Sequence, residues 1–310
     1  MKPLLVVGET NVDVVLRGPA AVPVPGREVI AEDCVLTLGS ASAICAVGLA
    51  RLGNAVVFVS RAGADLWGDY CLDILSAANV DTSHVVRDPA LQTGVTVSIS
   101  SGHDRALITY VGSIAEVRET DVSDELLERV QHLHVSSFFL QERLRKDCSR
   151  LFERATRHSV TTSLDPGFDP AERWSPDITA AAQAADVFLP NHVELTAISR
   201  RDSPEEGLVA FDGGRTRTVV KLGRAGSMTR EHGKTIHVPA FSLQAVDTTG
   251  AGDSFNAGFL HAFVRRMSTR DCLVYGNACG ALSTRALGGT AAQPTLEELT
   301  RFVDAGLQSR

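Results

Sequence analysis

Paired cysteines are missing from this chain: its six cysteines stand singly at positions 34, 45, 71, 148, 272 and 279. Zinc sites and disulfide frameworks need regular cysteine spacing, so this distribution argues against both and predicts reduced thiols in a cytoplasmic protein. Long hydrophobic runs are also missing, because Leu4–Val7 and Val56–Val59 are too short to span a bilayer. The N-terminus lacks the hydrophobic segment of a secretory signal, so neither secretion nor a membrane partner is expected.

Positive charge is in short supply, with 30 Lys and Arg against 37 Asp and Glu and a formal net charge of −7. A mildly acidic chain offers no broad phosphate-neutralising surface, so nucleic acid is not an expected partner. Internal repeats, low-complexity segments and Pro/Gly/Ser-rich linkers are absent as well. With 44% hydrophobic residues in 310, the composition is that of a globular protein with a large core. We therefore expect one domain over residues 1–310.

Short β-branched runs alternate with longer amphipathic segments along most of the chain. This alternation predicts an α/β fold in which a mostly parallel sheet is covered by helices on both faces. The predicted strands are Leu4–Val7, Ala55–Ser60, Leu133–Ser136, Val160–Leu164, Asp186–Leu189 and Thr216–Leu222. The predicted helices are Ser42–Leu52, Trp67–Ala78, Asp124–Val130, Arg143–Arg157, Asp253–Arg266, Thr269–Leu287 and Leu296–Leu307. Thr295 and Glu298 form a capping-box pattern at the start of the last helix.

Two stretches have strand-like alternation without helical periodicity. One is Asp13–Leu36, and the other is Thr93–Val111, which reads as a hairpin with a polar turn at Ser101–Asp104. We expect both to form a small β sheet that stands off the main sheet and covers a site as a lid. The exposed edge of such a sheet also makes a homodimer through the lid an expectation.

The run Asp247–Gly258 carries the strongest functional signal. Gly250 and Gly252 permit a backbone that exposes amides of Ala251, Gly252 and Asp253 at the start of an amphipathic helix, where the helix dipole favours an anion. Such donors suit a phosphoryl group in transfer, and Asp253 could take the proton of an attacking hydroxyl. Asp253 could instead be a first-turn acid that only stabilises the dipole. We favour the functional interpretation because so many turn-forming and polar residues stand in one compact run.

The other common nucleotide motifs are not present. No Gly-x-x-x-x-Gly-Lys-Ser/Thr occurs, so the chain is not a P-loop enzyme. Gly250-Ala-Gly252 resembles the opening of a dinucleotide fingerprint, but Phe255 holds the place of the third glycine.

Asp247–Gly258 is similar to the C-terminal signature of the PfkB (ribokinase) family of carbohydrate kinases, and weaker matches follow in the family's order. These are Gly8–Asp13, Ala50–Gly53, Gly63–Asp65 with Gly68, Thr93-Gly94, Asp165–Gly167, Asn191–Glu194, Lys221–Gly223 with Gly226, and Asn277–Ala281. The resemblance covers nearly the whole chain. It implies a ribokinase-like three-layer αβα sandwich with a small β-sheet lid. It also implies an ATP-dependent kinase that transfers the γ-phosphate to a hydroxyl of a sugar or sugar-like molecule, with Mg²⁺.

The resemblance implies roles for the residues of the signature. Asp253 is expected to be the general base, and Gly250, Ala251 and Gly252 are expected to line the anion hole. Asp247 and Thr249, together with the loop 285–289, match the place where family members often bind a monovalent cation such as K⁺. Asp247 could equally be a structural turn acid.

The resemblance also places the acceptor. Asp13, assisted by Asn11, matches the acid that holds acceptor hydroxyls, which suits a sugar because a carboxylate accepts two adjacent O–H groups well. Gly39 and Ser40 stand at the start of the next helix, in the substrate site. Arg105, in the lid hairpin, could meet an anionic group of the acceptor. The alternatives are a strand-end turn residue for Asp13 and a solvated turn residue for Arg105.

Nucleotide and metal contacts complete the expected site. Asn191 and Glu194 match the motif that organises Mg²⁺-bound phosphates, and we expect this role to be water-mediated because Mg²⁺ keeps much of its hydration shell. A helix N-cap followed by a surface acid is the alternative for this pair. Beyond them, the resemblance places Lys221, Gly223 and Gly226 near the ribose and phosphates, and Asn277 near the adenine.

One position departs from the family pattern. Where the family shows Gly-Gly and then a sugar-binding Asn, this chain has Gly39-Ser40 and Ile44. An apolar side chain cannot replace the lost hydrogen bond, unless Ser40 or Ser42 compensates, so the acceptor's identity stays open. A nucleoside kinase is one alternative, with Ile44 and Phe138 facing a base. A catalytically silent ligand-binding member of the fold is another.

Overall fold

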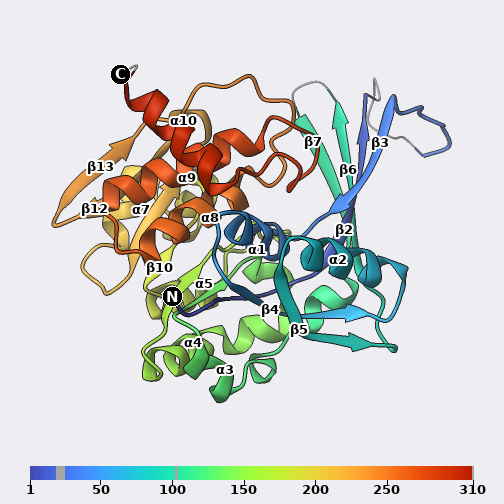
Figure 1. Cartoon of the computed structure of the whole chain (residues 1–310), viewed down its shortest axis with the longest axis horizontal. Coiled ribbons are helices and arrows are strands. Elements are labelled where there is room, and N and C mark those ends of the chain that lie inside the picture. The colour runs from blue at the N-terminus through green and yellow to red at the C-terminus, as the bar shows by residue number, and fades with distance from the viewer. Residues whose placement is uncertain (19–24, 102–103, 309–310) are drawn as a thin grey trace.

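The computed structural model describes residues 1–18, 25–101 and 104–308, with the side chains of 100, 101, 104, 105, 307 and 308 outside that description. Within these residues the strands form one nine-stranded sheet and one four-stranded sheet (Figure 1). The turn predicted at Ser101–Asp104 includes residues outside the described part of the chain. In the described residues, no helix is long and apolar enough to cross a membrane.

The main sheet has the strand order β13-β12-β11-β10-β9-β8-β1-β4-β5. The seven strands from β11 to β5 in this spatial order all pair in parallel with their neighbours. The remaining two, β12 and β13, form a hairpin that pairs antiparallel with β11. The bounds are β1 Leu4–Val7, β4 Val56–Gly63, β5 Val80–Asp88, β8 His132–Val135, β9 Thr161–Leu164, β10 Val187–Phe188, β11 Arg217–Lys221, β12 Ser227–Glu231 and β13 Lys234–Val238.

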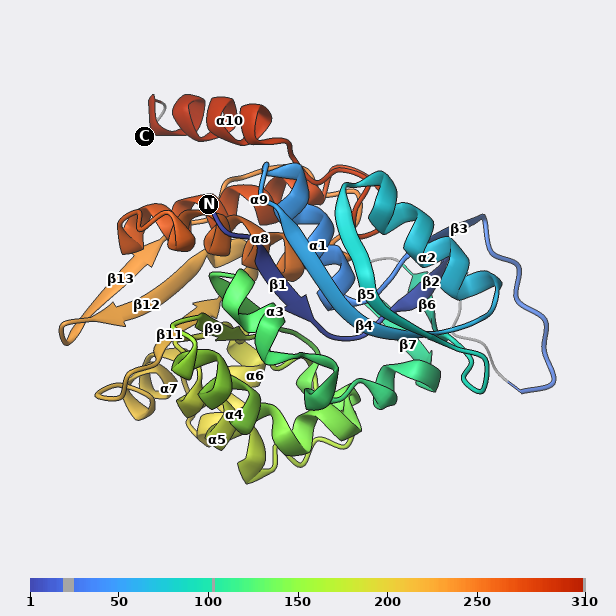
Figure 2. The same ribbon diagram turned by 60° about the horizontal axis from the view of Figure 1, so that its bottom comes forward.

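Helices cover both faces of this sheet, as the alternation of the sequence predicts (Figure 2). Leu4 and Val6 of β1 point into one core, whereas Leu5 and Val7 point into the other, because successive strand residues face opposite sides. One core is closed by α1 (Ala41–Arg51), α2 (Leu66–Ala77), α8 (Ala251–Val264), α9 (Thr269–Ser283) and α10 (Leu296–Gln308). The other is closed by α3 (Asp124–Arg129), α4 (Glu142–Arg157), α5 (Pro176–Ala184), α6 (His192–Ser199) and α7 (Pro204–Ala210).

The smaller sheet has the order β3-β2-β6-β7 and stands away from the main sheet, at the upper right of Figure 1. Its strands are β2 (Asn11–Arg17), β3 (Asp33–Leu38), β6 (Gly94–Ser101) and β7 (Asp104–Tyr110). They come from the two stretches that lack helical periodicity, and we call this sheet the lid. Because β2 follows β1 after three residues, the lid continues directly from β1, an inner strand of the main sheet. That residues 1–310 act as one domain stays a prediction.

Most predicted elements appear within a few residues of their expected bounds. The reciprocal bonds of Thr295 and Glu298 confirm the capping box at the start of α10. The helix predicted over Thr269–Leu287 ends earlier, at Ser283. The sequence pattern also missed β5, whose nine residues are mostly polar or only partly buried. It missed the β12–β13 hairpin and the helices α5, α6 and α7 as well, which are short and have weak periodicity of their own.

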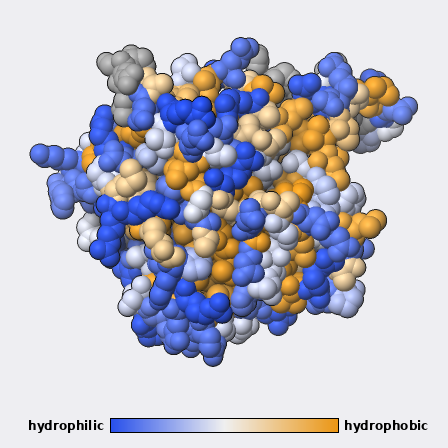
Figure 3. Space-filling view, viewed as in Figure 1, coloured by the Kyte–Doolittle hydropathy of each residue, from blue (hydrophilic) through white to orange (hydrophobic). Residues whose placement is uncertain are grey.

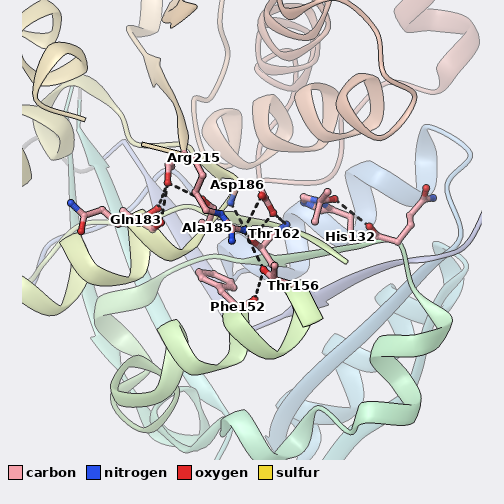
Figure 4. Close-up of polar contacts among 12 residues, drawn as sticks. His132, Phe152, Thr156, Thr162, Gln183, Ala185, Asp186 and Arg215 are labelled. Carbon is pink, nitrogen blue, oxygen red and sulfur yellow. Dashed lines mark hydrogen bonds and ion pairs between the residues drawn. The ribbon is translucent and has the colours of Figure 1, made fainter. Parts of the chain in front are cut away.

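The amino-terminal edge of the sheet holds a structural polar network (Figure 4). Asp186 accepts from the amide of Thr162 at 2.7 Å and from Arg215 at 2.8 Å, which links the ends of β9, β10 and β11. This network bridges backbone and side chains that are already fixed by the sheet. The functional polar groups therefore have to be sought at the opposite edge.

Candidate active site

Polar side chains gather where the parallel strands end at their carboxyl edge. Glu9 follows β1, Asp165 follows β9, Asn191 follows β10, and Lys221 is the last residue of β11. Asn191 and Lys221 are bridged in parallel, so these two ends lie side by side. Strand order reverses at β1, which has β4 on one side and β8 on the other. Open α/β sheets bind their ligands at such a switch point.

Helices α1 and α8 direct their N-termini to this same edge. A Cβ added to Gly250 would lie 3.1 Å from Cγ2 of Ile44, and one added to Gly48 would lie 2.8 Å from Cβ of Ala257. The later residues of α1 therefore pack against the later residues of α8, and the two helices run in the same direction. Two positive dipole ends consequently meet at the site, an arrangement that favours bound anions.

The glycine turn before α8 has the expected shape, with one difference. Gly250 is the N-cap and has a positive φ of 71°. Ser254 makes the first helical bond, from its amide to the carbonyl of Gly250 at 2.8 Å. The amide of Ala251 donates to the carbonyl of Thr248 at 3.2 Å, so the turn itself uses this donor. An anion site here has to rely on the amides that follow, in the exposed residue Gly252 and in the half-buried Asp253.

A buried cluster of charges lies beside that turn. The ammonium of Lys221 is 2.5 Å from Oδ2 of Asp165, and the amide of Asn256 donates to the same oxygen at 2.5 Å. Burial alone would lower the pKa of Lys221, but the charges of Asp165, Glu194 and Asp253 outweigh it and the net shift is upward. Because these charges act on one lysine, the structure brings together predicted residues from three separate motifs.

Asn191 and Glu194 form a capping box at the start of α6. The side chain of Asn191 accepts from the amide of Glu194 at 2.9 Å, and the carboxylate of Glu194 accepts from the amide of Asn191 at 2.7 Å. The N-cap alternative is therefore part of their role. Glu194 is nevertheless buried rather than a surface acid, and burial, followed by the charge of Asp165, raises its pKa to about 7. A carboxyl group whose pKa is raised to near pH 7 beside other acids is typical of functional sites.

Asn11 and Asp13 lie together at the base of the lid. The amide of Asn11 donates to Oδ1 of Asp13 at 2.9 Å. A side chain on Gly39 would collide with both groups, so this glycine provides the room for the pair. Asp13 stands in register with Thr37 and Thr96, and Thr96 with Thr109. These four positions share one face of the lid, which is therefore a polar face.

The loop between α9 and α10 connects the lid to the glycine turn. A Cβ on Gly288 would lie 2.8 Å from Oγ1 of Thr37, which is the register partner of Asp13. A Cβ on Gly250 would lie 2.7 Å from Cα of Gly289. The neighbouring residues 288 and 289 thus touch both the lid base and the turn before α8. That Asp13 and Asp253 act together in one site stays a prediction, which this proximity of the lid base and the turn supports.

Ser40 and Ile44 are committed to the packing of α1. The hydroxyl of Ser40 donates to the carbonyl of Glu9 at 2.6 Å and accepts from the amide of Ala43, which makes Ser40 the N-cap. The hydroxyl of Ser42 donates to the carboxylate of Glu9 at 2.6 Å. Ile44 is 3% exposed and wedged against Gly250. These serines satisfy Glu9, so neither one is placed to replace a sugar-binding asparagine.

The residues expected around the nucleotide lie at the far end of the site from the lid. Gly223 and Gly226 form the turn after Lys221, with φ of 57° and 98°. A side chain on Gly226 would collide with the carbonyl of Val238, and Asn277 donates to that carbonyl at 3.0 Å. The structure therefore brings Gly226 and Asn277 together. Their contact with a nucleotide stays a prediction.

Asp247 fastens the turn to the loop that follows α9. Its Oδ1 accepts from the amide of Thr249 at 2.9 Å and from the hydroxyl of Thr249 at 2.8 Å, and its Oδ2 accepts from the amide of Gly288 at 2.9 Å. These bonds give Asp247 the turn-forming role that the sequence left open. A monovalent cation beside it stays a prediction, as does a role for Arg105, whose side chain lies outside the described residues.

Sequence reasoning gave no role to three residues of this site. Asp165 and Glu9 are buried carboxylates directly after buried strands, and that position was the signal for both. Asn256 is fully buried on α8, and its signal was an amide amid apolar helix neighbours. A polar residue in such a place needs a partner, but only the folded chain identifies which one.

The chain is similar along almost its whole length to known carbohydrate kinases. The sequence model of the family described as pfkB family carbohydrate kinase matches residues 1–296. Ribokinase from Haemophilus influenzae is 26% identical over 313 residues, which cover 98% of this chain and 99% of that protein.

Solved structures confirm the ribokinase-like fold. Arabidopsis thaliana ribokinase, complexed with ribose and ATP, has a TM-score of 0.84 at 23% identity over 97% of this chain and 98% of that one. A fructokinase double mutant from Vibrio cholerae, bound to fructose, ADP and a potassium ion, has a TM-score of 0.81 at 24% identity over 98% of both chains. Since the family match runs from residue 1 to residue 296, the chain belongs to the pfkB family of carbohydrate kinases, phosphotransferases that act on a sugar hydroxyl.

Proposed function

We propose that this protein transfers the γ-phosphoryl group of ATP to a hydroxyl of a sugar or sugar-like acceptor, with Asp253 as the general base. The acceptor lies between the lid and α1, where the carboxylate of Asp13 and the amide of Asn11 bind its hydroxyls. Asp253 takes the proton of the attacking hydroxyl, while amides at the start of α8 hold the phosphoryl group. ADP leaves toward the turn of Gly223 and Gly226.

One observation carries this proposal. Asp253 stands at the N-terminus of α8 within the electrostatic reach of Lys221 and Glu194, next to the exposed backbone of Gly252. A base, a cation and a helix N-terminus thus converge at one point. Transfer of a phosphoryl group to an alcohol needs these three elements. The polar face of the lid, opposite this point, fits a hydroxylated acceptor better than an apolar one.

The donors at this point also fit Mg²⁺. The carboxylate of Glu194 is a hard oxygen ligand, and Mg²⁺ prefers such oxygens while it keeps several waters. Glu194 would hold the ion through water. When bound, Mg²⁺ neutralises part of the charge on the β- and γ-phosphates. Potassium beside Asp247 is proposed by analogy with the Vibrio cholerae fructokinase, and it predicts higher activity in K⁺ than in tetramethylammonium salts.

The first test replaces Asp253 with asparagine. Asp253→Asn should lower kcat at least about a hundredfold, because the variant cannot accept a proton, and should leave ATP affinity nearly unchanged. Asp271→Asn is the matched control, since Asp271 is the first-turn acid of the neighbouring helix α9. If Asp253 only stabilised a helix dipole, both variants would retain comparable activity, and the assignment of the base would be wrong.

The acceptor is tested with a panel of pentoses, hexoses, sugar acids and nucleosides, measured by ADP release. We expect sugars or sugar acids to react. Ile44 and Phe138 are 3% and 1% exposed, so neither presents an open apolar wall to a base, which disfavours a nucleoside. Turnover of nucleosides alone would replace the sugar proposal. Binding of ATP and Mg²⁺ without transfer to any acceptor would instead support a catalytically silent protein.

A further inference from the structure

Lys221 brings an ammonium group to the start of α8. A Cβ added to Gly252 would lie 3.7 Å from Nζ of Lys221, so the ammonium is in contact range of the first turn of that helix. The side chain is 13% exposed, and the neighbouring Gly252 is exposed. A ligand that reaches the amides of this turn therefore also reaches the ammonium.

Two partners fix this ammonium. It donates to Oδ2 of Asp165 at 2.5 Å and to Oδ1 of Asn256 at 3.5 Å. Asn256 donates in turn to Oδ2 of Asp165 at 2.5 Å, and Oδ1 of Asp165 accepts from the amide of Gly167 at 3.0 Å. The three side chains come from β11, from α8 and from the loop after β9. An ammonium group has three donors, and these partners account for two of them.

The charges of the cluster keep the ammonium protonated. Burial by itself would lower the pKa of Lys221, but Asp165 is the largest opposing charge and the net pKa is raised. A cation that is already held in place needs no reorganisation when charge develops on a transferred group, so it stabilises the transition state effectively. The exposed lysines of the surface lack this property.

We propose that Lys221 is the cation that contacts the transferred phosphoryl group, and that Asp165 and Asn256 are its positioning residues. This rests on the proposed function. In the step, the acceptor oxygen forms a bond to the γ-phosphorus, and the bond between that phosphorus and the bridging oxygen breaks. The electron pair of the broken bond leaves with ADP, and the hydroxyl proton passes to Asp253. Lys221 neither gains nor loses a proton.

The first experiment compares nucleotides with and without a γ-phosphate and needs no knowledge of the acceptor. Calorimetry with Mg²⁺ measures the affinity for ADP and for the β,γ-imido analogue of ATP. Lys221→Met should weaken the analogue about tenfold to a hundredfold, the value of a charge-assisted contact, and ADP less than about threefold. Lys234→Met, an exposed lysine of β13, is the matched control and should change neither.

The second experiment tests the positioning role through pH. In Asp165→Asn, Lys221 loses its strongest stabilising charge and should deprotonate more easily. In this variant, the ratio of the affinity for the imido analogue to the affinity for ADP should therefore fall by at least about tenfold between pH 7 and pH 9.5. In the wild type this ratio should stay constant. The double variant Asp165→Asn/Lys221→Arg should recover pH independence, because arginine keeps its proton. Thermal unfolding of each variant verifies that it is folded.

The outcomes separate this inference from the function on which it rests. If Lys221→Met lost equal affinity for ADP and for the imido analogue, the proposed contact with the γ-phosphate would be wrong. A loss in Asp165→Asn that is the same at every pH would overturn the positioning role and leave a structural one. If the wild type bound neither nucleotide, the proposed kinase function itself would fail. If the wild type binds both nucleotides and Lys221→Met binds them with unchanged affinity, only the inference about Lys221 would be wrong.

Discussion

Gly250 and Gly252 lie two residues apart, yet each lacks a side chain for a different reason. Gly250 has a positive φ, and a Cβ there would come within 2.7 Å of Cα of Gly289. Position 250 therefore needs glycine because of its backbone angle and this close approach. Gly252 has room for a Cβ, with nothing nearer than Nζ of Lys221 at 3.7 Å. The absence of a side chain at Gly252 therefore leaves open space in front of the helix N-terminus, where the proposed phosphoryl group would bind.

We predict that Gly252→Ala folds normally and loses activity. Alanine is favoured over glycine in a helix, so the free energy of unfolding should change by less than about 1 kcal/mol. The methyl group covers the place where the phosphoryl group has to approach Lys221, so kcat/KM should fall at least about tenfold. Urea unfolding and initial rates measure the two effects.

Gly250→Ala is the matched contrast. Its strained φ and the contact with Gly289 should lower the free energy of unfolding by about 1–3 kcal/mol. A Gly252→Ala protein with full activity would mean that no ligand uses the space in front of α8.

At the scale of single elements, strands β8 and β9 carry a buried chain of polar side chains on one face. His132 is bonded to Thr161 and Ser163 at 2.8 Å each, and Ser163 and Ser136 flank His134 at 2.7 and 2.8 Å. Both ring nitrogens of each buried histidine are thus paired with hydroxyl groups, as buried polar atoms require.

Because of these two buried histidines, we predict that the protein loses stability in acid. Burial lowers the pKa of His132 to about 3 and that of His134 to about 4, against 6.5 in the unfolded chain. The unfolded state therefore binds more protons below pH 6.5, and stability is lost progressively as pH falls from 6.5 to the folded-state pKa values of about 4 and about 3.

His134→Gln should cost about 1–3 kcal/mol at pH 7, because Ser163 and Ser136 lose partners. The difference in the free energy of unfolding between the variant and the wild type should then become smaller as pH falls from 6.5 toward 4. Urea midpoints at three or four pH values measure it. A gap of constant size would show that His134 does not titrate as its burial requires.

At the scale of the whole molecule, the lid has two chemically different faces. Leu36, Val14, Val97 and Ile108 stand in one row across its four strands, on the side opposite to Asp13 and Thr96. Ile108 is 64% exposed and Leu36 is 38% exposed. Hydrophobic side chains are visible over the upper right of Figure 3, where Figure 1 places the lid. A face of this kind suits burial against a second lid.

If the protein dimerises through the lid, Ile108→Asp should shift it from dimer to monomer in analytical ultracentrifugation, because a buried charge without a partner is costly. Val209→Asp is the control, an exposed apolar residue on α7 at 55% exposure. A wild type that sediments as a monomer at all concentrations would contradict the dimer. Equal effects of both variants would place the interface elsewhere.

The sequence by itself determined the layered α/β architecture, the lid segments and the glycine turn with Asp253. Each of these depends on neighbours in the chain: periodicity sets which face of an element is buried, and glycines set the turn. Only the tertiary structure decided that Lys221, Asp165 and Asn256 form one cluster and that Ser40 serves Glu9. These contacts join residues 31 to 91 positions apart, and no local pattern encodes them. They arise only when parallel strands and helix N-termini converge at one edge of the sheet.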